Sequence, residues 1–191
     1  MGSSPSSPVL TKEVMEEYLL LTYLSEREIF RLYTMLCSLC TVDFNGTLRN
    51  FAFRFPVTSI EQLFPELMYN PFKDRIFRVF SSLRDGKMSF EDLLDLCSVM
   101  SENCPAQVKA AYAFQIFDFD EDNCIGEQDL TEALNRLIGG FGSVTSSQLS
   151  RITNTLLGKM DFTKSGSIGE TEFVHALGKM PEFSIAFSFR L

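Results

Sequence analysis

The segment Asp118-Phe-Asp-Glu-Asp-Asn-Cys-Ile-Gly-Glu-Gln-Asp129 carries alternating acids in its first half and a further carboxylate at its end. Residues with helical apolar spacing flank it on both sides, for example Phe114 and Phe117 before it and Leu130 and Leu134 after it. Hard divalent cations need several oxygen ligands at once, and a tight twelve-residue loop brings alternating carboxylates together. The spacing therefore predicts a helix–loop–helix metal site.

The expected ligands of this first metal loop are Asp118, Asp120, Asp122, Cys124 and Asp129, at positions 1, 3, 5, 7 and 12. Cys124 is expected to offer its backbone carbonyl and not its thiol. Asn123 stands where Gly usually makes the sharp turn, and Asn tolerates positive φ better than most side chains. Because Asp129 is shorter than the usual Glu, it disfavours bidentate coordination, and the lower ligand number suits Mg²⁺ better, so we expect less selective binding of Ca²⁺.

A second loop runs from Asp161 to Glu172, with Gly166 at the turn. Its expected ligands are Asp161, Thr163, Ser165, Ser167 and Glu172. Hydroxyl groups stand at positions 3 and 5, where carboxylates are usual, so only two carboxylates would face a dication. We expect a weaker metal site here, and the sequence leaves open whether it fills at physiological Ca²⁺.

Two earlier segments keep the loop spacing without the ligands. Aligning Met88 with position 8 assigns positions 1, 3, 5 and 12 to Ser81, Leu83, Asp85 and Asp92. Aligning Val57 in the same way assigns those positions to Asn50, Ala52, Arg54 and Glu61. Leu83 and Ala52 have no side-chain ligand atom, so both segments are expected to be degenerate, metal-free loops.

Apolar spacing and capping residues predict an all-α fold built from helix–loop–helix units. The expected helices cover about 11–20, a segment that opens at Ser25, 59–69, 72–80, 90–100, 106–117, 127–138, 148–160 and 169–179. An irregular insertion at 41–56 and a Gly/Ser linker at 139–147 interrupt them. We expect a flexible N-terminus (1–10), an N-terminal lobe with the degenerate loops (11–104) and a C-terminal lobe with both metal loops and an apolar tail (105–191).

Composition excludes several classes of function. The 191 residues carry 17 Lys and Arg against 25 Asp and Glu, a net charge of −8, so the chain has no general attraction for nucleic acid. No apolar stretch is long enough to span a bilayer, and no secretory signal begins the sequence. The one histidine, His175, and the lack of a nucleophile–base pair argue against an enzyme. We expect a cytoplasmic protein that is monomeric when free.

The N-terminus, Met1-Gly-Ser-Ser-Pro-Ser6, fits the N-myristoylation pattern with Gly2 as the acceptor. A plain Ser-rich terminus is the alternative. Since one acyl chain binds a membrane only marginally, the modification would give reversible membrane association.

Apolar residues on the helices of the C-terminal half are candidates for a partner groove. They are Leu130, Leu134, Leu137, Leu156, Met160, Phe173 and Leu177. A groove of this kind accepts an amphipathic helix through anchors at i, i+3/i+4 and i+7, although such stripes are often ordinary core. The tail residues Phe183, Ile185, Phe187 and Phe189 would be costly to leave exposed. We hypothesise that the tail fills the groove until a partner displaces it.

Four segments of the chain resemble the calcium- and integrin-binding protein family of the EF-hand superfamily. They are Asn70-Pro-Phe-Lys-Asp-Arg-Ile-Phe-Arg-Val-Phe-Ser81, Met88-Ser-Phe-Glu-Asp-Leu-Leu-Asp95, Tyr112-Ala-Phe-Gln-Ile-Phe-Asp-Phe-Asp120 and residues 181–191. The family's Asp at position 12 of the third loop matches Asp129. The resemblance implies metal in the third and fourth loops, and a myristoylated adaptor for cytoplasmic segments of membrane proteins. Integrin α tails and mechanotransduction channel subunits are the implied partners.

Two functions from different classes fit these features. The first is a Ca²⁺- or Mg²⁺-binding adaptor that holds a helical segment of a membrane protein in an apolar groove. The alternative is a regulatory subunit of a kinase or phosphatase, similar in role to calcineurin B. The same groove would serve both.

Overall fold

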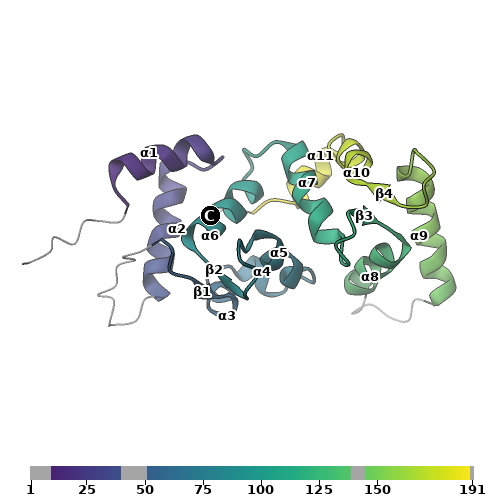
Figure 1. Cartoon of the computed structure of the whole chain (residues 1–191), viewed down its shortest axis with the longest axis horizontal. Helices are drawn as coiled ribbons and strands as arrows, with labels where there is room; N and C mark the ends of the chain where they lie inside the picture. Colours follow the sequence, from purple (N-terminus) through teal and green to yellow (C-terminus); the bar gives the residue numbers. More distant parts are fainter. Residues whose placement is uncertain (1–9, 40–50, 139–144, 190–191) are drawn as a thin grey trace, which may run out of the picture. The chain divides into compact units, whose positions relative to one another are not determined.

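The structure is a computed structural model that describes residues 10–39, 51–138 and 145–189. These residues form two compact units (Figure 1). Of the described residues, the first unit takes those within 10–68 and 80–104 together with Phe189, and the second takes those within 69–79 and 105–188. Helices dominate both units, and each unit has one ladder of two very short strands. The expected all-α fold is confirmed.

Within residues 10–39, 51–68 and 80–104, the first unit contains five α-helices, one 3-10 turn and two strands. They are α1 (Lys12–Leu21), α2 (Glu26–Leu39), β1 (Phe55–Pro56), α3 (Val57–Ile60), η2 (Glu61–Leu63), α4 (Pro65–Met68), β2 (Lys87–Met88) and α6 (Phe90–Met100). Helix α2 lies against α1 and α6. Its apolar face, including Ile29, Leu32 and Leu36, is fully buried, which is why this segment is helical although its outer face is charged.

Aromatic rings fill the centre of the first unit. The ring of Phe90 stacks on Phe51 with centroids 5.0 Å apart, and the rings of Tyr18 and Tyr33 meet it edge-on. Large rings of this kind supply much of the apolar burial that holds a small unit together. Phe90 begins α6 directly after the cap Ser89, so this packing also fixes where the preceding loop ends.

The prediction of a single helix over 59–69 is wrong, because the segment forms the three separate elements α3, η2 and α4. Pro65 lacks a backbone N–H, and its ring disfavours the α region for the residue before it. Phe64 accordingly has φ −126° and ψ 81°, outside the helical range. The break leaves Phe64 2% exposed, as a core residue.

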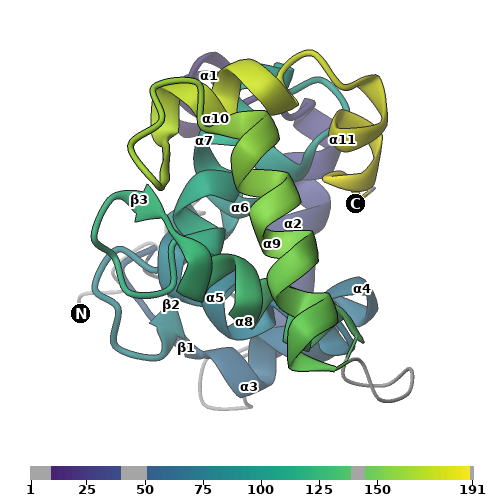
Figure 2. The same ribbon diagram turned by 90° about the vertical axis from the view of Figure 1, so that its right-hand side faces the viewer.

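In the part of the second unit that the structure describes, most of α5 (Lys73–Phe80) is joined by five further helices and two strands. The elements after α5 are α7 (Ala106–Phe117), β3 (Cys124–Ile125), α8 (Glu127–Ile138), α9 (Ser146–Met160), β4 (Ile168–Gly169), α10 (Glu170–Leu177) and α11 (Pro181–Ala186). Helix α7 lies against α8, α10 and α11, and α9 lies against α8 and α10 (Figure 2).

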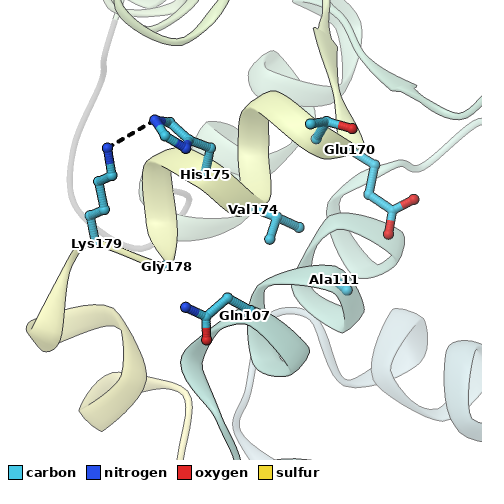
Figure 3. A pocket seen from close by; sticks show the side chains of 8 residues that line it. Gln107, Ala111, Glu170, Val174, His175, Gly178 and Lys179 are labelled. Carbon is cyan, nitrogen blue, oxygen red and sulfur yellow. Dashed lines mark hydrogen bonds between the residues drawn. The ribbon is translucent and has the colours of Figure 1, made fainter.

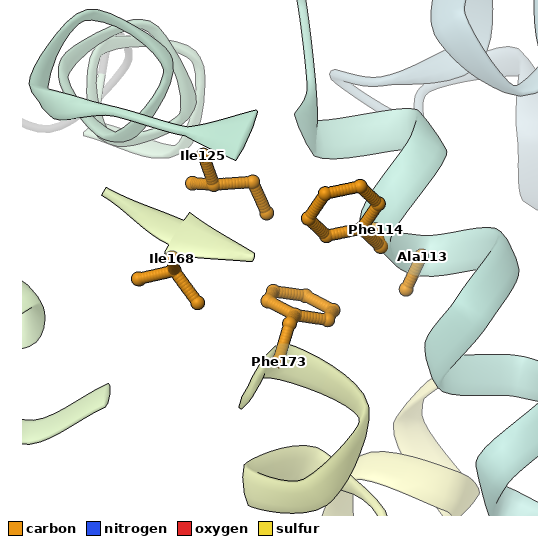
Figure 4. Close-up of a cluster of buried hydrophobic side chains, with 5 residues drawn as sticks. All are labelled: Ala113, Phe114, Ile125, Ile168 and Phe173. Carbon is orange, nitrogen blue, oxygen red and sulfur yellow. The ribbon is translucent and has the colours of Figure 1, made fainter. Parts of the chain in front are cut away.

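The core of the second unit connects its two loops. Ile125 and Ile168 pair across the β3–β4 ladder, and both are buried against Phe114 and Phe173 (Figure 4). Ala113 completes this cluster of buried side chains. Each loop therefore contributes its isoleucine to one packed cluster.

Residues 69–79 group with the second unit, whereas the sequence-based division at residue 104 places them in the first lobe. Within the second unit, the ring of Phe72 meets Phe117 edge-on at 5.1 Å. Arg75 and Arg78 both pair with Glu121, at 3.0 and 2.5 Å. These contacts between residues far apart in sequence explain the grouping. The two-lobe division itself stays a prediction.

Among the helices of residues 10–39, 51–138 and 145–189, none is long and apolar enough to cross a bilayer. The predicted acylation site Gly2, most of the insertion at 41–56 and most of the linker at 139–147 lie outside the described residues. Of the linker, Thr145 caps α9 through a capping box with Gln148, so the helix begins two residues earlier than expected.

Candidate metal centre

The loop 118–129 begins where α7 ends and closes in the first turn of α8. Asp118 is the C-cap of α7, with φ −78° and ψ 86°, which turns the chain out of the helix. Glu121 and Asn123 then adopt left-handed φ of 61° and 66°. Asn123 thus makes the sharp turn that Gly usually makes, as its tolerance of positive φ predicts.

Asp118 is held by the backbone of its own loop. Its Oδ1 accepts a hydrogen bond from the N–H of Asp122 at 3.2 Å, and its Oδ2 accepts one from Asn123 at 3.0 Å. Burial raises the pKa of Asp118, and the nearby carboxylate of Asp129 adds to the rise, against the lowering effect of the Asn123 N–H. A buried carboxylate that is crowded by another acid is one that a cation would stabilise.

Asp129 is 4% exposed and closes the loop. Its Oδ1 accepts the N–H of Phe119 at 2.8 Å, and its Oδ2 accepts the N–H of Gly126 at 2.9 Å. Glu172, at the same position of the loop 161–172, accepts the N–H groups of positions 3 and 9. The shorter Asp129 thus reaches position 2 where that Glu reaches position 3. Both carboxylate oxygens are oriented toward the loop before any ion is considered.

The carboxylates of this loop converge. Asp118, Asp120 and Asp129 each have a carboxylate oxygen within 4.8 Å of the others, the one such group of three or more His, Cys, Asp or Glu among the described residues. Asp122 accepts the N–H of Cys124 at 2.8 Å and is exposed. A cluster of oxygen donors without nitrogen or sulfur suits a hard cation such as Ca²⁺ or Mg²⁺. The residues present thus fit the expected ion.

The loop 161–172 repeats this backbone pattern with fewer acids. Asp161 accepts the N–H groups of Ser165 and Gly166 at 3.0 and 2.8 Å. Glu172 accepts those of Thr163 and Gly169 at 2.9 and 3.0 Å. Backbone hydrogen bonds lower the pKa of both acids, which are more solvated than Asp118.

Hydroxyl groups complete the loop 161–172 in place of acids. The Oγ of Ser165 donates to the carbonyl of Ser167 at 2.9 Å, and the Oγ1 of Thr163 lies 3.3 Å from the Oδ1 of Asp161. The five expected ligand residues therefore all lie in this loop, although only Asp161 and Glu172 carry a negative charge. Fewer charged ligands give a weaker site.

The predicted groove residues lie at different depths in the second unit. Leu130, Met160 and Leu177 are partly buried and pack against the core cluster, of which Phe173 is a member. Leu137 is 55% exposed, and Leu134 is half-buried. Leu156 lines a shallow hollow on α9 together with Ile152.

The apolar tail packs within both units. Phe183 and Phe187 stack at 5.4 Å on the partly buried edge of the core cluster, while Ile185 between them is 76% exposed. In the first unit, the N–H of Phe189 donates to the carbonyl of Met100 at 3.1 Å, and its ring contacts Phe64.

A buried lysine forms hydrogen bonds with this tail. Lys109 of α7 is fully buried, and its Nζ donates to the carbonyl of Ser184 at 3.2 Å and contacts the Oγ of Ser188. The sequence offered no signal for this contact, because Lys109 and the tail are far apart in the chain. For the same reason, the sequence offered no signal for the ion pairs of Arg75 and Arg78 with Glu121.

A second, open hollow of about 600 Å³ lies between α7 and α10 (Figure 3). Gln107 and Ala111 line it on one side, and Val174 and Glu170 on the other. At its rim the Nε2 of His175 lies 2.9 Å from the Nζ of Lys179. The histidine is therefore paired with an exposed lysine that follows the end of its helix.

Comparison with known proteins identifies the family. The EF-hand domain pair family matches residues 107–178, which contain both loops of the second unit. Calcium and integrin-binding family member 2 of Mus musculus is 30% identical over 187 residues, which are 96% of this chain and 97% of that protein. The chain belongs to the calcium and integrin-binding family. The resemblance inferred from the sequence is confirmed.

Two further members of the same family are similar to this chain. Member 2 of Drosophila melanogaster is 36% identical over 138 residues, 72% of this chain and 71% of that protein. Member 3 of Mus musculus is 37% identical over 127 residues, 66% of this chain and 78% of that protein.

Proposed function

We propose that this chain is a regulatory protein that binds a divalent cation in the loop 118–129, and more weakly in the loop 161–172. The single observation that carries the proposal is the convergence of the Asp118, Asp120 and Asp129 carboxylates on one loop whose backbone already holds them. The names of the relatives, which specify calcium binding, support Ca²⁺ as the ion. When bound, the ion would supply positive charge that offsets the crowded carboxylates.

We also propose that Mg²⁺ competes for the first of these loops. Asp129 provides one methylene less reach than Glu, and both of its oxygens are already engaged by the N–H groups of Phe119 and Gly126. Monodentate coordination by Asp129 would leave a smaller ligand number, which Mg²⁺ accepts more readily than Ca²⁺ does.

The proposed regulatory role is that of an adaptor for a helical cytoplasmic segment of a membrane protein. Integrin binding in the relatives' names supports a partner of this class. Partly buried apolar residues on α8, α9 and α10, with the tail packed beside them, supply a surface of the right chemistry for an amphipathic helix. Acylation at Gly2, a cytoplasmic location and a monomeric free state belong to the same proposal.

An amphipathic helical peptide with apolar residues at i, i+4 and i+7 tests the adaptor role. Its affinity for the full chain, measured by fluorescence anisotropy, is expected to be on the order of tenfold higher in Ca²⁺ than in chelator, because binding and metal occupancy are coupled. A peptide of the same composition with a central Pro is the control and should bind weakly under both conditions. Equal affinity for the helical and the Pro peptide would contradict a helix-binding groove.

Deleting residues 181–191 is expected to raise the affinity for the helical peptide by roughly 5- to 150-fold, the usual range of such couplings. The tail covers the core cluster through Phe183 and Phe187 and competes as an intramolecular ligand. The matched control is Ile185→Ser, since Ile185 is exposed and should leave the affinity unchanged. Unchanged affinity after the deletion would remove the displacement idea while leaving metal binding untouched.

A further inference from the structure

The degenerate loop 81–92 of the first unit has the backbone of a metal loop. Arg84 and Gly86 have φ of 51° and 73°, at the same two positions where Glu121 and Asn123 have 61° and 66°. Lys164 and Gly166 repeat the pattern in the loop 161–172, with 58° and 91°. Three loops of one chain thus share a turn, although the acids at positions 1 and 3 are missing in the loop 81–92.

Asp92, the last residue of the loop 81–92, accepts the same pair of backbone hydrogen bonds as the last acid of the loop 118–129. Asp92 accepts the N–H of Ser82 at 3.1 Å through one oxygen and the N–H of Ser89 at 2.9 Å through the other. Asp129 accepts the equivalent two N–H groups in the loop 118–129. Asp92 is 4% exposed, so its negative charge lies in a place where an unpaired carboxylate would be costly.

A guanidinium group occupies the centre of this loop. Arg54 makes six donor–acceptor contacts of 2.8–3.2 Å with oxygen atoms of Ser81, Ser82, Asp85, Lys87 and Asp92. Its side chain is 14% exposed. The contact with Lys87 is to the backbone carbonyl, and Asp85 accepts through both of its oxygens.

Four of the five residues whose oxygen atoms Arg54 contacts stand at ligand positions of a metal loop. Ser81, Asp85, the carbonyl of Lys87 and Asp92 are at positions 1, 5, 7 and 12, which in the loop 118–129 belong to Asp118, Asp122, Cys124 and Asp129. A planar cation with several donors can bind such converging oxygens. The guanidinium also holds the pKa of Asp85 below its ordinary value.

The position of Arg54 follows from the β1–β2 ladder. Phe55 pairs with Met88, so Phe55 and not Val57 takes position 8 of the preceding segment, and the alignment expected from the sequence is wrong by two residues. Phe55 is 3% exposed and anchors β1 in the core. The residue before it, Arg54, is thereby held beside the loop 81–92.

We propose that Arg54 is a built-in cation that takes the place of a metal ion in the loop 81–92, so that this loop keeps its folded geometry with or without Ca²⁺. The positive charge comes from a residue of the neighbouring segment, and it ties the two degenerate helix–loop–helix segments of the first unit together. This proposal does not depend on metal binding by the second unit.

Thermal unfolding of the full chain in chelator tests the proposal with the variant Arg54→Ala. Its Tm is expected to fall on the order of 10 °C, because Asp92 is left buried without its partner. The matched control is Arg31→Ala, since Arg31 is an exposed arginine of the same unit, and its Tm should change by less than about 2 °C. A Tm of Arg54→Ala equal to that of Arg31→Ala would overturn the proposal.

Guanidinium chloride at low millimolar concentration then separates a bound cation from a merely structural side chain. It should raise the Tm of Arg54→Ala above that in equal NaCl, and leave Arg31→Ala and the natural sequence unchanged. If guanidinium chloride does not raise the Tm of Arg54→Ala above its value in NaCl, a cation site in the loop is contradicted. If Arg54→Ala does not fold, Arg54→Lys keeps the charge without the planar fork and is expected to fold with a smaller loss.

Hydrogen exchange of the natural sequence tests the same point without any variant. The amides of Ser82, Lys87 and Ser89 donate to Asp92 or Asp85. On adding saturating Ca²⁺, their protection should change no more than that of the core amide of Leu93 in α6, which donates to the carbonyl of Ser89. A rise in protection confined to the amides of Ser82, Lys87 and Ser89 would mean that an ion enters the loop, and would overturn the proposal.

Discussion

Replacing Phe173 with Ala is expected to lower the free energy of unfolding of the second unit by about 3–5 kcal/mol, the usual cost of removing a buried aromatic side chain. Phe173 is 6% exposed, and its ring lies 5.7 Å from Phe114 and 6.2 Å from Phe117. These rings pack against the isoleucines of the β3–β4 ladder. The substitution therefore opens a cavity where the isoleucines of the two loops pack together.

The matched control for Phe173→Ala is Phe162→Ala. Phe162 is a residue of the same type in the same unit, but it is 60% exposed at the start of the loop 161–172. Its loss should cost well under about 1 kcal/mol. Chemical denaturation of the full chain in chelator measures both variants. Similar losses for Phe173→Ala and Phe162→Ala would contradict the cluster as the core of this unit.

Replacing Asp118 with Ala is expected to remove most of the stabilisation that Ca²⁺ gives the chain. A ligand at 100 times its Kd stabilises the folded state by about 2.7 kcal/mol, which for a chain of this size raises Tm by roughly 5–10 °C. Asp118 supplies one of the three converging carboxylates and also accepts the N–H groups that shape the turn. Thermal unfolding with and without Ca²⁺ gives the difference in Tm.

Asp161→Ala is the matched comparison for Asp118→Ala. Asp161 stands at position 1 of the weaker loop and accepts equivalent N–H groups, from Ser165 and Gly166. This variant should keep most of the Ca²⁺-dependent rise in Tm. If Asp161→Ala loses the rise and Asp118→Ala keeps it, the order of the two sites is the reverse of the one proposed.

Much of the second unit could be predicted from its sequence, because its signals are local. The helix bounds 106–117 and 127–138 agree with α7 and α8, since apolar spacing runs up to each end of a loop with fixed ligand positions. The pairing of Ile125 with Ile168 follows from their shared position 8. Local patterns of this kind are reliable when the turn chemistry and the apolar periodicity agree.

Most features that the sequence analysis does not predict depend on residues far apart in the chain. The break at Pro65 is the exception, because a proline inside the helix expected over 59–69 is a local signal for a break. The register of Phe55 opposite Met88 had none, because a two-residue strand leaves too short a pattern to fix its alignment. Arg54 and Lys109 each act on oxygen atoms of distant segments, and spacing along the chain does not reveal such contacts.

Calorimetric titration of the metal-free natural sequence with Ca²⁺, with and without physiological Mg²⁺, measures directly whether the loop 118–129 binds a divalent cation. We predict a saturable binding event without Mg²⁺, a lower apparent affinity in its presence, and loss of the event in Asp118→Ala. Absence of any saturable heat under both conditions, with no change in thermal stability, would contradict a divalent-cation site in the loop 118–129.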